Sequence, residues 1–111
     1  MNKDTKFLTH ILESTQFILK WTEGISFEKF AQDEVLQNAV IRKLEIIGEA
    51  STRISTPFKD HHLNFPWREM KAMRNKLIHE YEGVNLRTVW LTINNDLPQL
   101  HKSTREFLDS L

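Results

Sequence analysis

The sequence predicts an all-α protein, an up-and-down bundle of four to five helices that forms one domain over residues 1–111. Glycine and proline are scarce, with three of each, whereas an all-β fold needs many turns. Apolar residues recur at helical spacing through most of the chain. Hydrophobic residues make up 40% of the composition, which is enough for one modest core.

The first helix is expected from about Asp4 to Trp21, where apolar residues form one stripe. Gly24 suits the position that follows a helix, because glycine readily adopts the left-handed conformation found there. Ser26 can cap a short turn of helix over residues 27–30.

A long second helix is predicted from Asp33, its N-cap, to about Ile54. Gly48 lies in the middle of this helix, where glycine costs roughly 1 kcal/mol relative to alanine. That cost suggests that another helix packs closely at Gly48. Glu45 and Glu49 lie one turn apart on a different face from the apolar stripe.

Residues 55–65 are predicted to form a loop. Pro66 fits the first position of the next helix, because its missing N–H is unused there. We expect that helix to loosen near Tyr81, since Gly83 follows.

The remaining residues complete the helical pattern. Asn85 can cap a fourth helix. Asp96 and Pro98 then start, or kink into, a last helix that ends at Leu111.

Composition narrows the possible functions. Cysteine is absent, which excludes disulfides, a thiol nucleophile and a thiolate metal site. The formal net charge is zero, whereas many nucleic-acid-binding proteins carry a basic excess. Neither a leader segment nor an apolar run of membrane-spanning length appears, so a soluble cytoplasmic protein is expected.

The run from Arg74 to Tyr81 carries the most chemistry in the chain. An arginine can hold a phosphate through its bidentate fork, and a histidine moves protons near neutral pH. A tyrosine hydroxyl can donate, accept or be modified. The surrounding segment is locally basic, which fits either a phosphate-facing patch or a solvated helix face. Its basic residues are Arg68, Lys71, Arg74 and Lys76, against Glu69 alone.

Helical geometry separates these groups on one chain. On an ideal helix Arg74 and Tyr81 point in nearly the same direction, whereas His79 lies about 140° around from Arg74. Convergence therefore requires the helix to end or distort near His79, or a second copy of the chain to supply the missing group. Taken singly, each of the three residues also has an ordinary structural explanation.

The segment resembles the HepT-like branch of the HEPN-domain proteins. Members carry Arg, four intervening residues, His, one residue and Tyr, which Arg74, His79 and Tyr81 match. The flanking segments are similar as well, so the resemblance extends over roughly residues 42–98. Two positions depart from the family's usual residues: Ala72, where glycine is frequent, and Asn85, where aspartate is common. Neither departure touches the motif.

The resemblance implies a HEPN-like bundle and a metal-independent endoribonuclease toxin that works as a homodimer, with two motifs facing one cleft. His79 would act as general base or acid, Arg74 would bind the scissile phosphate, and Tyr81 would position the RNA. The RNA 2′-hydroxyl would be the nucleophile, so that cleavage leaves a cyclic phosphate. No cofactor or metal is expected.

The resemblance also implies a protein partner, a minimal nucleotidyltransferase antitoxin that can transfer AMP to Tyr81. The added bulk and negative charge beside Arg74 would then block the phosphate. Glu45, Glu49 and Asn75 are candidates for orienting Arg74 or His79, although the two glutamates also fit an exposed pair of surface charges.

Two other interpretations remain open. The chain could be a non-catalytic module that binds a nucleotide or the nucleotidyltransferase, which its net neutrality favours, or a structural dimer with an incidental motif. His61 and His62 could form a metal pair with Asp60, although adjacent histidines in a polar loop are more often ordinary loop residues.

Overall fold

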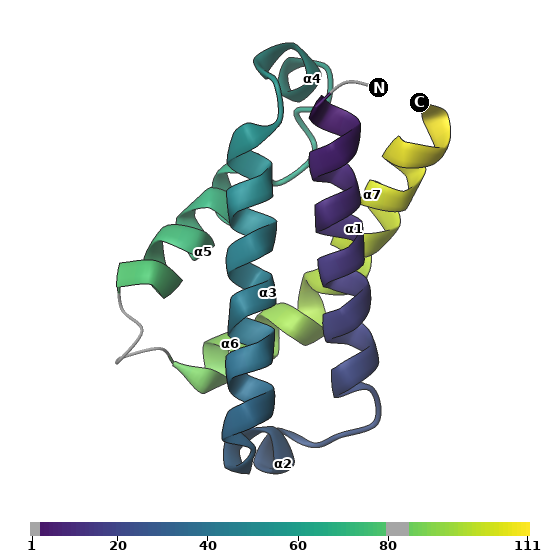
Figure 1. The fold of residues 1–111 in the computed structure, drawn as a ribbon. Coiled ribbons are helices and arrows are strands. Elements are labelled where there is room, and N and C mark those ends of the chain that lie inside the picture. The colour runs from purple at the N-terminus through teal and green to yellow at the C-terminus, as the bar shows by residue number, and fades with distance from the viewer. Residues whose placement is uncertain (1–2, 80–84) are drawn as a thin grey trace.

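The computed structural model describes residues 3–79 and 85–111. Within these ranges it describes every side chain except those of Ile78 and His79. These residues form helices and no strand (Figure 1), which confirms the all-α prediction. The helices are α1 (Lys3–Thr22), α2 (Phe27–Gln32), α3 (Glu34–Arg53), α4 (Thr56–Asp60), α5 (Trp67–His79), α6 (Leu86–Asn95) and α7 (Leu97–Ser110).

α1, α3, α5 and the consecutive pair of α6 and α7 alternate in direction as an up-and-down bundle, with the short helices α2 and α4 at its two ends (Figure 1). α3 is the central helix, because it packs against α1 on one side and α5 on the other. α7 packs against α1 and α6 and places the C-terminus at the same end as the N-terminus.

Local capping residues start three of the helices, as the sequence predicts. The Ser26 hydroxyl accepts from the backbone N–H of Lys29, and the Asp33 carboxylate accepts from that of Leu36. Asn85 begins α6 in the same way. After α1, Gly24 adopts a φ of +75°, a conformation that favours glycine.

Two predictions need correction. Residues 55–65 are not all loop, because Thr56–Asp60 form the single-turn helix α4, capped by the Ser55 hydroxyl. Pro66 is not the first residue of α5 but directly precedes it, and its carbonyl accepts from the N–H of Met70 at 3.1 Å.

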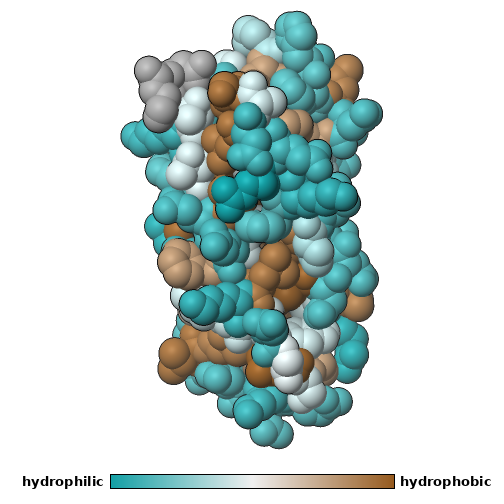
Figure 2. Space-filling model, turned by 90° about the vertical axis from the view of Figure 1, so that its right-hand side faces the viewer, coloured by the Kyte–Doolittle hydropathy of each residue, from teal (hydrophilic) through white to brown (hydrophobic). Residues whose placement is uncertain are grey.

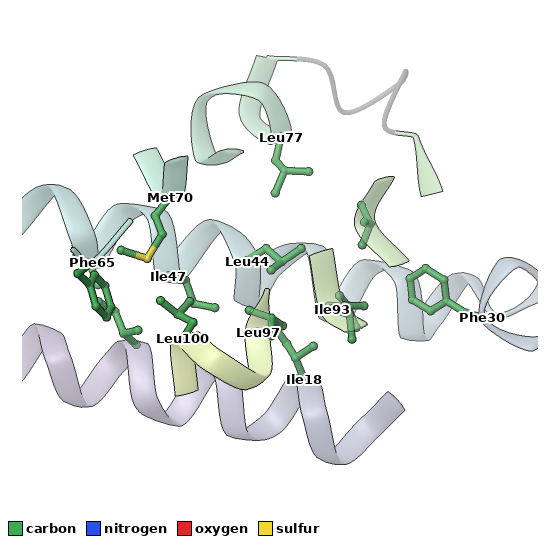
Figure 3. Packing of buried hydrophobic residues seen from close by; sticks show 14 residues of the cluster. Ile18, Phe30, Leu44, Ile47, Phe65, Met70, Leu77, Ile93, Leu97 and Leu100 are labelled. Carbon is green, nitrogen blue, oxygen red and sulfur yellow. The ribbon is translucent and has the colours of Figure 1, made fainter. Parts of the chain in front are cut away.

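The core runs along the length of α3. Figure 3 shows apolar side chains from most of the helices meeting there, and the labelled ones are Ile18, Phe30, Leu44, Ile47, Phe65, Met70, Leu77, Ile93, Leu97 and Leu100. Trp90 packs on this cluster, with its ring centroid 5.2 Å from that of Phe30.

The outer surface is mostly polar. On the face drawn in Figure 2, apolar side chains show through in separate patches between hydrophilic ones. Within residues 3–79 and 85–111, none of the helices combines the length and the apolar character needed to cross a bilayer.

Candidate active site on helix α5

Helix α5 is anchored to the bundle by its apolar side. Met70 and Leu77 are buried in the core, and Phe65 is buried just before the helix begins. These contacts fix the register of α5 against α3, and that register decides which polar side chains meet.

Gly48 lets the two helices come close together at Arg74. A Cβ atom at position 48 would lie 2.8 Å from the carbonyl oxygen of Met70 and 2.9 Å from Cγ of Arg74. Both distances are shorter than real Cβ contacts, so only glycine fits without movement of α5. The close packing predicted from Gly48 is therefore confirmed, and the helix that packs there carries the motif arginine.

The Arg74 guanidinium is held on two sides. Nη2 forms an ion pair with Oε2 of Glu49 at 2.9 Å, and Nη1 donates to Oδ1 of Asn75 at 2.8 Å. The Arg74 side chain is 24% exposed and the Glu49 side chain 45%. The guanidinium is thus fixed on the protein side while part of it still faces solvent.

Glu49 contacts a second arginine that sequence reasoning did not select. Nε of Arg53 donates to Oε1 of Glu49 at 3.2 Å, one turn further along α3. The i,i+4 spacing from Glu49 to Arg53 was the signal that could have identified this pair.

Glu45 does not join this network. It is half-buried one turn before Glu49, and its side chain makes neither a hydrogen bond nor an ion pair with any residue that the structure describes. Of the three residues predicted to support the motif, Glu49 and Asn75 contact Arg74, and Glu45 does not.

The predicted basic patch is exposed along α5. Arg68, Lys71 and Lys76 all face solvent, and none forms an ion pair within residues 3–79 and 85–111. Lys59 of α4 lies near this patch but is partly buried, and burial and then the nearby Lys71 charge lower the pKa of its ammonium. The three exposed cations of α5 are therefore the ones available to phosphates.

The rest of the motif lies at the edge of what the structure describes. His79 is the last residue of α5, so the helix carries the backbone of both Arg74 and His79. The His79 side chain, Tyr81 and Gly83 fall outside the described residues, and so does the predicted loosening of the helix near Tyr81. Their convergence with Arg74 stays a prediction.

His61 and His62 are engaged in local packing. The Nδ1 atom of His61 donates to the Pro57 carbonyl at 2.7 Å, and that of His62 donates to the Phe58 carbonyl at 2.9 Å. The His62 ring also stacks on the Phe58 ring. These contacts favour the interpretation of both histidines as ordinary structural residues.

Comparison with known proteins identifies the family. The family model described as "Ribonuclease HepT-like" matches residues 11–107. A protein of Caldanaerobacter subterraneus subsp. tengcongensis named "Putative RNase TTE0752" is 45% identical over 97% of this chain and 96% of its own length. A Thermococcus cleftensis protein named "Probable ribonuclease HepT" is 50% identical over 85% of this chain and 86% of its own. No solved structure matches the chain significantly. The chain belongs to the HepT-like ribonuclease family.

Proposed function

We propose that this protein is a metal-independent endoribonuclease, the cytoplasmic toxin of a type II toxin–antitoxin pair. The observation that carries the proposal is the Arg74 guanidinium, oriented by Glu49 and Asn75 and 24% exposed, on the helix that also carries His79. An arginine fork fixed in this way is suited to a phosphodiester, since it matches two phosphate oxygens. Membership of a ribonuclease family supports RNA as the substrate.

The proposed reaction needs only groups that the protein and RNA possess. A His79 imidazole takes the proton of the 2′-hydroxyl, and the 2′ oxygen attacks the adjacent phosphorus. The bond from phosphorus to the 5′ oxygen breaks, and that oxygen takes a proton from an acid. The products are a cyclic phosphate and a 5′-hydroxyl. Arg74 stabilises the charge that builds on the phosphate oxygens.

A homodimer would supply the second proton-transfer group. One chain carries one copy of the Arg74–His79 motif, whereas the reaction uses a base for the nucleophile and an acid for the leaving group. Two motifs facing one cleft would provide both histidines.

Silencing is proposed to act at Tyr81. A minimal nucleotidyltransferase antitoxin would transfer AMP to the Tyr81 hydroxyl. The phosphate of the added group would compete with RNA for Arg74, and its bulk would obstruct the cleft.

The proposal is tested by controlled expression of the wild type beside His79→Ala and Arg74→Ala, with and without the nucleotidyltransferase. Growth arrest and RNA loss are expected only for unprotected wild type. Purified wild type should cleave RNA in EDTA and should not cleave a substrate with 2′-deoxy at the scissile position. Cleavage by His79→Ala at the wild-type rate would contradict the mechanism.

A non-catalytic binding module is the second candidate, favoured by the zero net charge of the chain. In that case the Arg74 site would hold a nucleotide or dock the nucleotidyltransferase without turnover. Saturable nucleotide binding, with intact RNA after incubation with many substrates, would favour this function over the nuclease.

A further inference from the structure

Glu49 lies between two arginines and binds them through different oxygens. Oε2 pairs with Nη2 of Arg74 on α5 at 2.9 Å, while Oε1 accepts from Nε of Arg53 on α3 at 3.2 Å. In the part of the chain that the structure describes, Glu49 takes part in both ion pairs. One carboxylate thus neutralises the motif arginine while it is also tied to a second cation.

The surroundings of Glu49 are basic on the side away from α5. The carboxylate borders a shallow hollow lined by Lys3, Lys6, Phe7, Glu49, Thr52 and Arg53. A Glu49 side chain that left Arg74 would therefore remain among positive charges.

The hold on Arg74 is incomplete. Its Nε atom is buried and has no hydrogen-bond partner among residues 3–79 and 85–111. An arginine binds a phosphate or carboxylate best through two parallel N–H bonds, and here Glu49 receives only one. The ion pair with Glu49 is therefore only half of the bidentate contact that the guanidinium can make with one anion.

We propose that Glu49 is a displaceable counter-ion of Arg74. It holds the guanidinium in place while the site is free of RNA, and it passes to Arg53 when a backbone phosphate takes the Arg74 fork. The inference rests on the proposed ribonuclease function and adds to it the step by which the site accepts a phosphate. Glu49 acts through Arg74, so it is a positioning residue.

Charge explains why the exchange is reversible. A carboxylate and a phosphate compete for the same donors and repel each other, so the RNA must displace Glu49 to bind. Arg53 keeps the displaced carboxylate paired, which avoids a stranded charge. Since the Glu49 side chain is 45% exposed, solvent screens the pair and lets it exchange.

The first test replaces the charge but keeps the shape. Glu49→Gln should bind a 2′-O-methyl RNA oligonucleotide, which cannot be cleaved, about three- to tenfold more tightly than wild type, equivalent to about 0.7–1.4 kcal/mol. With cleavable RNA, KM should fall, because the carboxylate that competes with the phosphate for Arg74 is gone. Unchanged or weaker binding by Glu49→Gln would overturn the inference.

Glu34→Gln is the matched control. It makes the same charge change at an exposed position of the same helix, about 22 Å away at 1.5 Å per residue. At 0.1 M salt that exceeds the screening length of about 10 Å, so binding should not change. Equal tightening by both variants would mean that net charge, and not the contact with Arg74, is responsible, and would also overturn the inference.

A double-mutant cycle tests the role of Arg53. Arg53→Gln should weaken RNA binding about two- to threefold, because Glu49 then has only Arg74 to pair with. In the Glu49→Gln background the same change should have no effect. Equal weakening in both backgrounds would show that Arg53 contacts RNA directly and would refute the exchange between the two arginines.

The outcomes separate this inference from the proposed function. If wild type neither binds nor cleaves RNA, the ribonuclease proposal fails and the inference fails with it. If wild type cleaves RNA but Glu49→Gln binds it no more tightly, only the inference fails. Thermal unfolding of each variant checks for a folding defect. Glu49→Ala removes the carboxylate in a second way, and it should also bind RNA more tightly than wild type.

Discussion

Gly48 of α3 lies directly against Arg74 of α5, close enough that a methyl group at position 48 would overlap the arginine side chain. The same added atom would also come within 2.8 Å of the Met70 carbonyl. Because the obstruction includes backbone, rotation of the arginine alone cannot relieve it. The distance between the two helices at the motif is therefore set by a glycine on the neighbouring helix.

Gly48→Ala should lower both stability and activity. Overpacking typically costs about 1–3 kcal/mol, and alanine returns about 1 kcal/mol of helix propensity, so a net loss of up to about 2 kcal/mol is expected. Cleavage should fall about tenfold to a hundredfold, since Arg74 would be displaced. Urea unfolding and the RNA cleavage rate, measured on the same preparation, check the two effects.

Gly24→Ala is the matched glycine control. Position 24 has open space around it but a φ of +75°, so the substitution should cost about 1–2 kcal/mol through backbone strain. Its cleavage rate should stay at the wild-type value below the unfolding transition. If both variants lose cleavage equally, the loss follows stability and the contact with Arg74 has no special part.

Arg74→Lys should remove activity and preserve the fold. Lysine keeps the charge but loses the planar fork, so kcat is expected to fall about a hundredfold, as when a transition-state donor is lost. Stability should change by less than about 1 kcal/mol, because the half-exposed Glu49 stays paired with Arg53. Arg87→Lys on α6, at a cation that lies 4.2 Å from the Phe27 ring centroid, is the control and should cleave normally.

The basic residues of α5 should determine the salt dependence of RNA binding. Each phosphate contact on a single strand contributes about −0.7 to the slope of log K against log salt. Lys71→Gln and Lys76→Gln should therefore each flatten the slope by about 0.7, and the double variant by about 1.4. Binding of a 2′-O-methyl oligonucleotide from 50 to 200 mM salt would measure this.

Lys102→Gln provides the comparison for that series. Lys102 is exposed on α7, a helix that packs mainly against α1 and α6, and should leave the slope unchanged. A slope that flattens equally in this variant would mean that total charge governs binding and that α5 carries no specific phosphate contacts.

The parts of the fold that depend on local chemistry could be predicted from the sequence. Ser26, Asp33 and Asn85 each bond a backbone N–H three residues ahead, so neighbouring residues were sufficient to identify them. α4 could not be predicted in the same way. Its five residues make a single turn, which has no apolar periodicity to detect and is not stable by itself.

The sequence indicates Glu45, Glu49 and Asn75 as candidate partners of Arg74 or His79, but it does not specify which of them contacts Arg74. Glu49 could have remained a surface partner of Arg53, and its spacing to that residue is a sufficient reason to expect so. Its contact with Arg74 depends on how α5 is aligned against α3, which Gly48, Met70 and Leu77 determine together. That alignment is a tertiary property, and a single sequence does not specify it.

Asp4 holds α4 onto α1, and its replacement should destabilise the protein without affecting the motif. Oδ1 accepts from the Ser55 N–H at 2.7 Å and Oδ2 from the Ser55 hydroxyl at 2.6 Å, while Asp4 itself is only 9% exposed. Asparagine has one acceptor oxygen in place of two, so Asp4→Asn should lose about 1.5–3 kcal/mol, the range for bonds to a charged group. Urea unfolding should show this loss, and the Phe58 amide should exchange hydrogen faster.

Asp109→Asn is the control for this prediction. Asp109 is exposed in the last turn of α7, and its replacement should shift stability by less than about 0.5 kcal/mol. Equal stability of the two variants would mean that water satisfies Ser55 as well as Asp4 does.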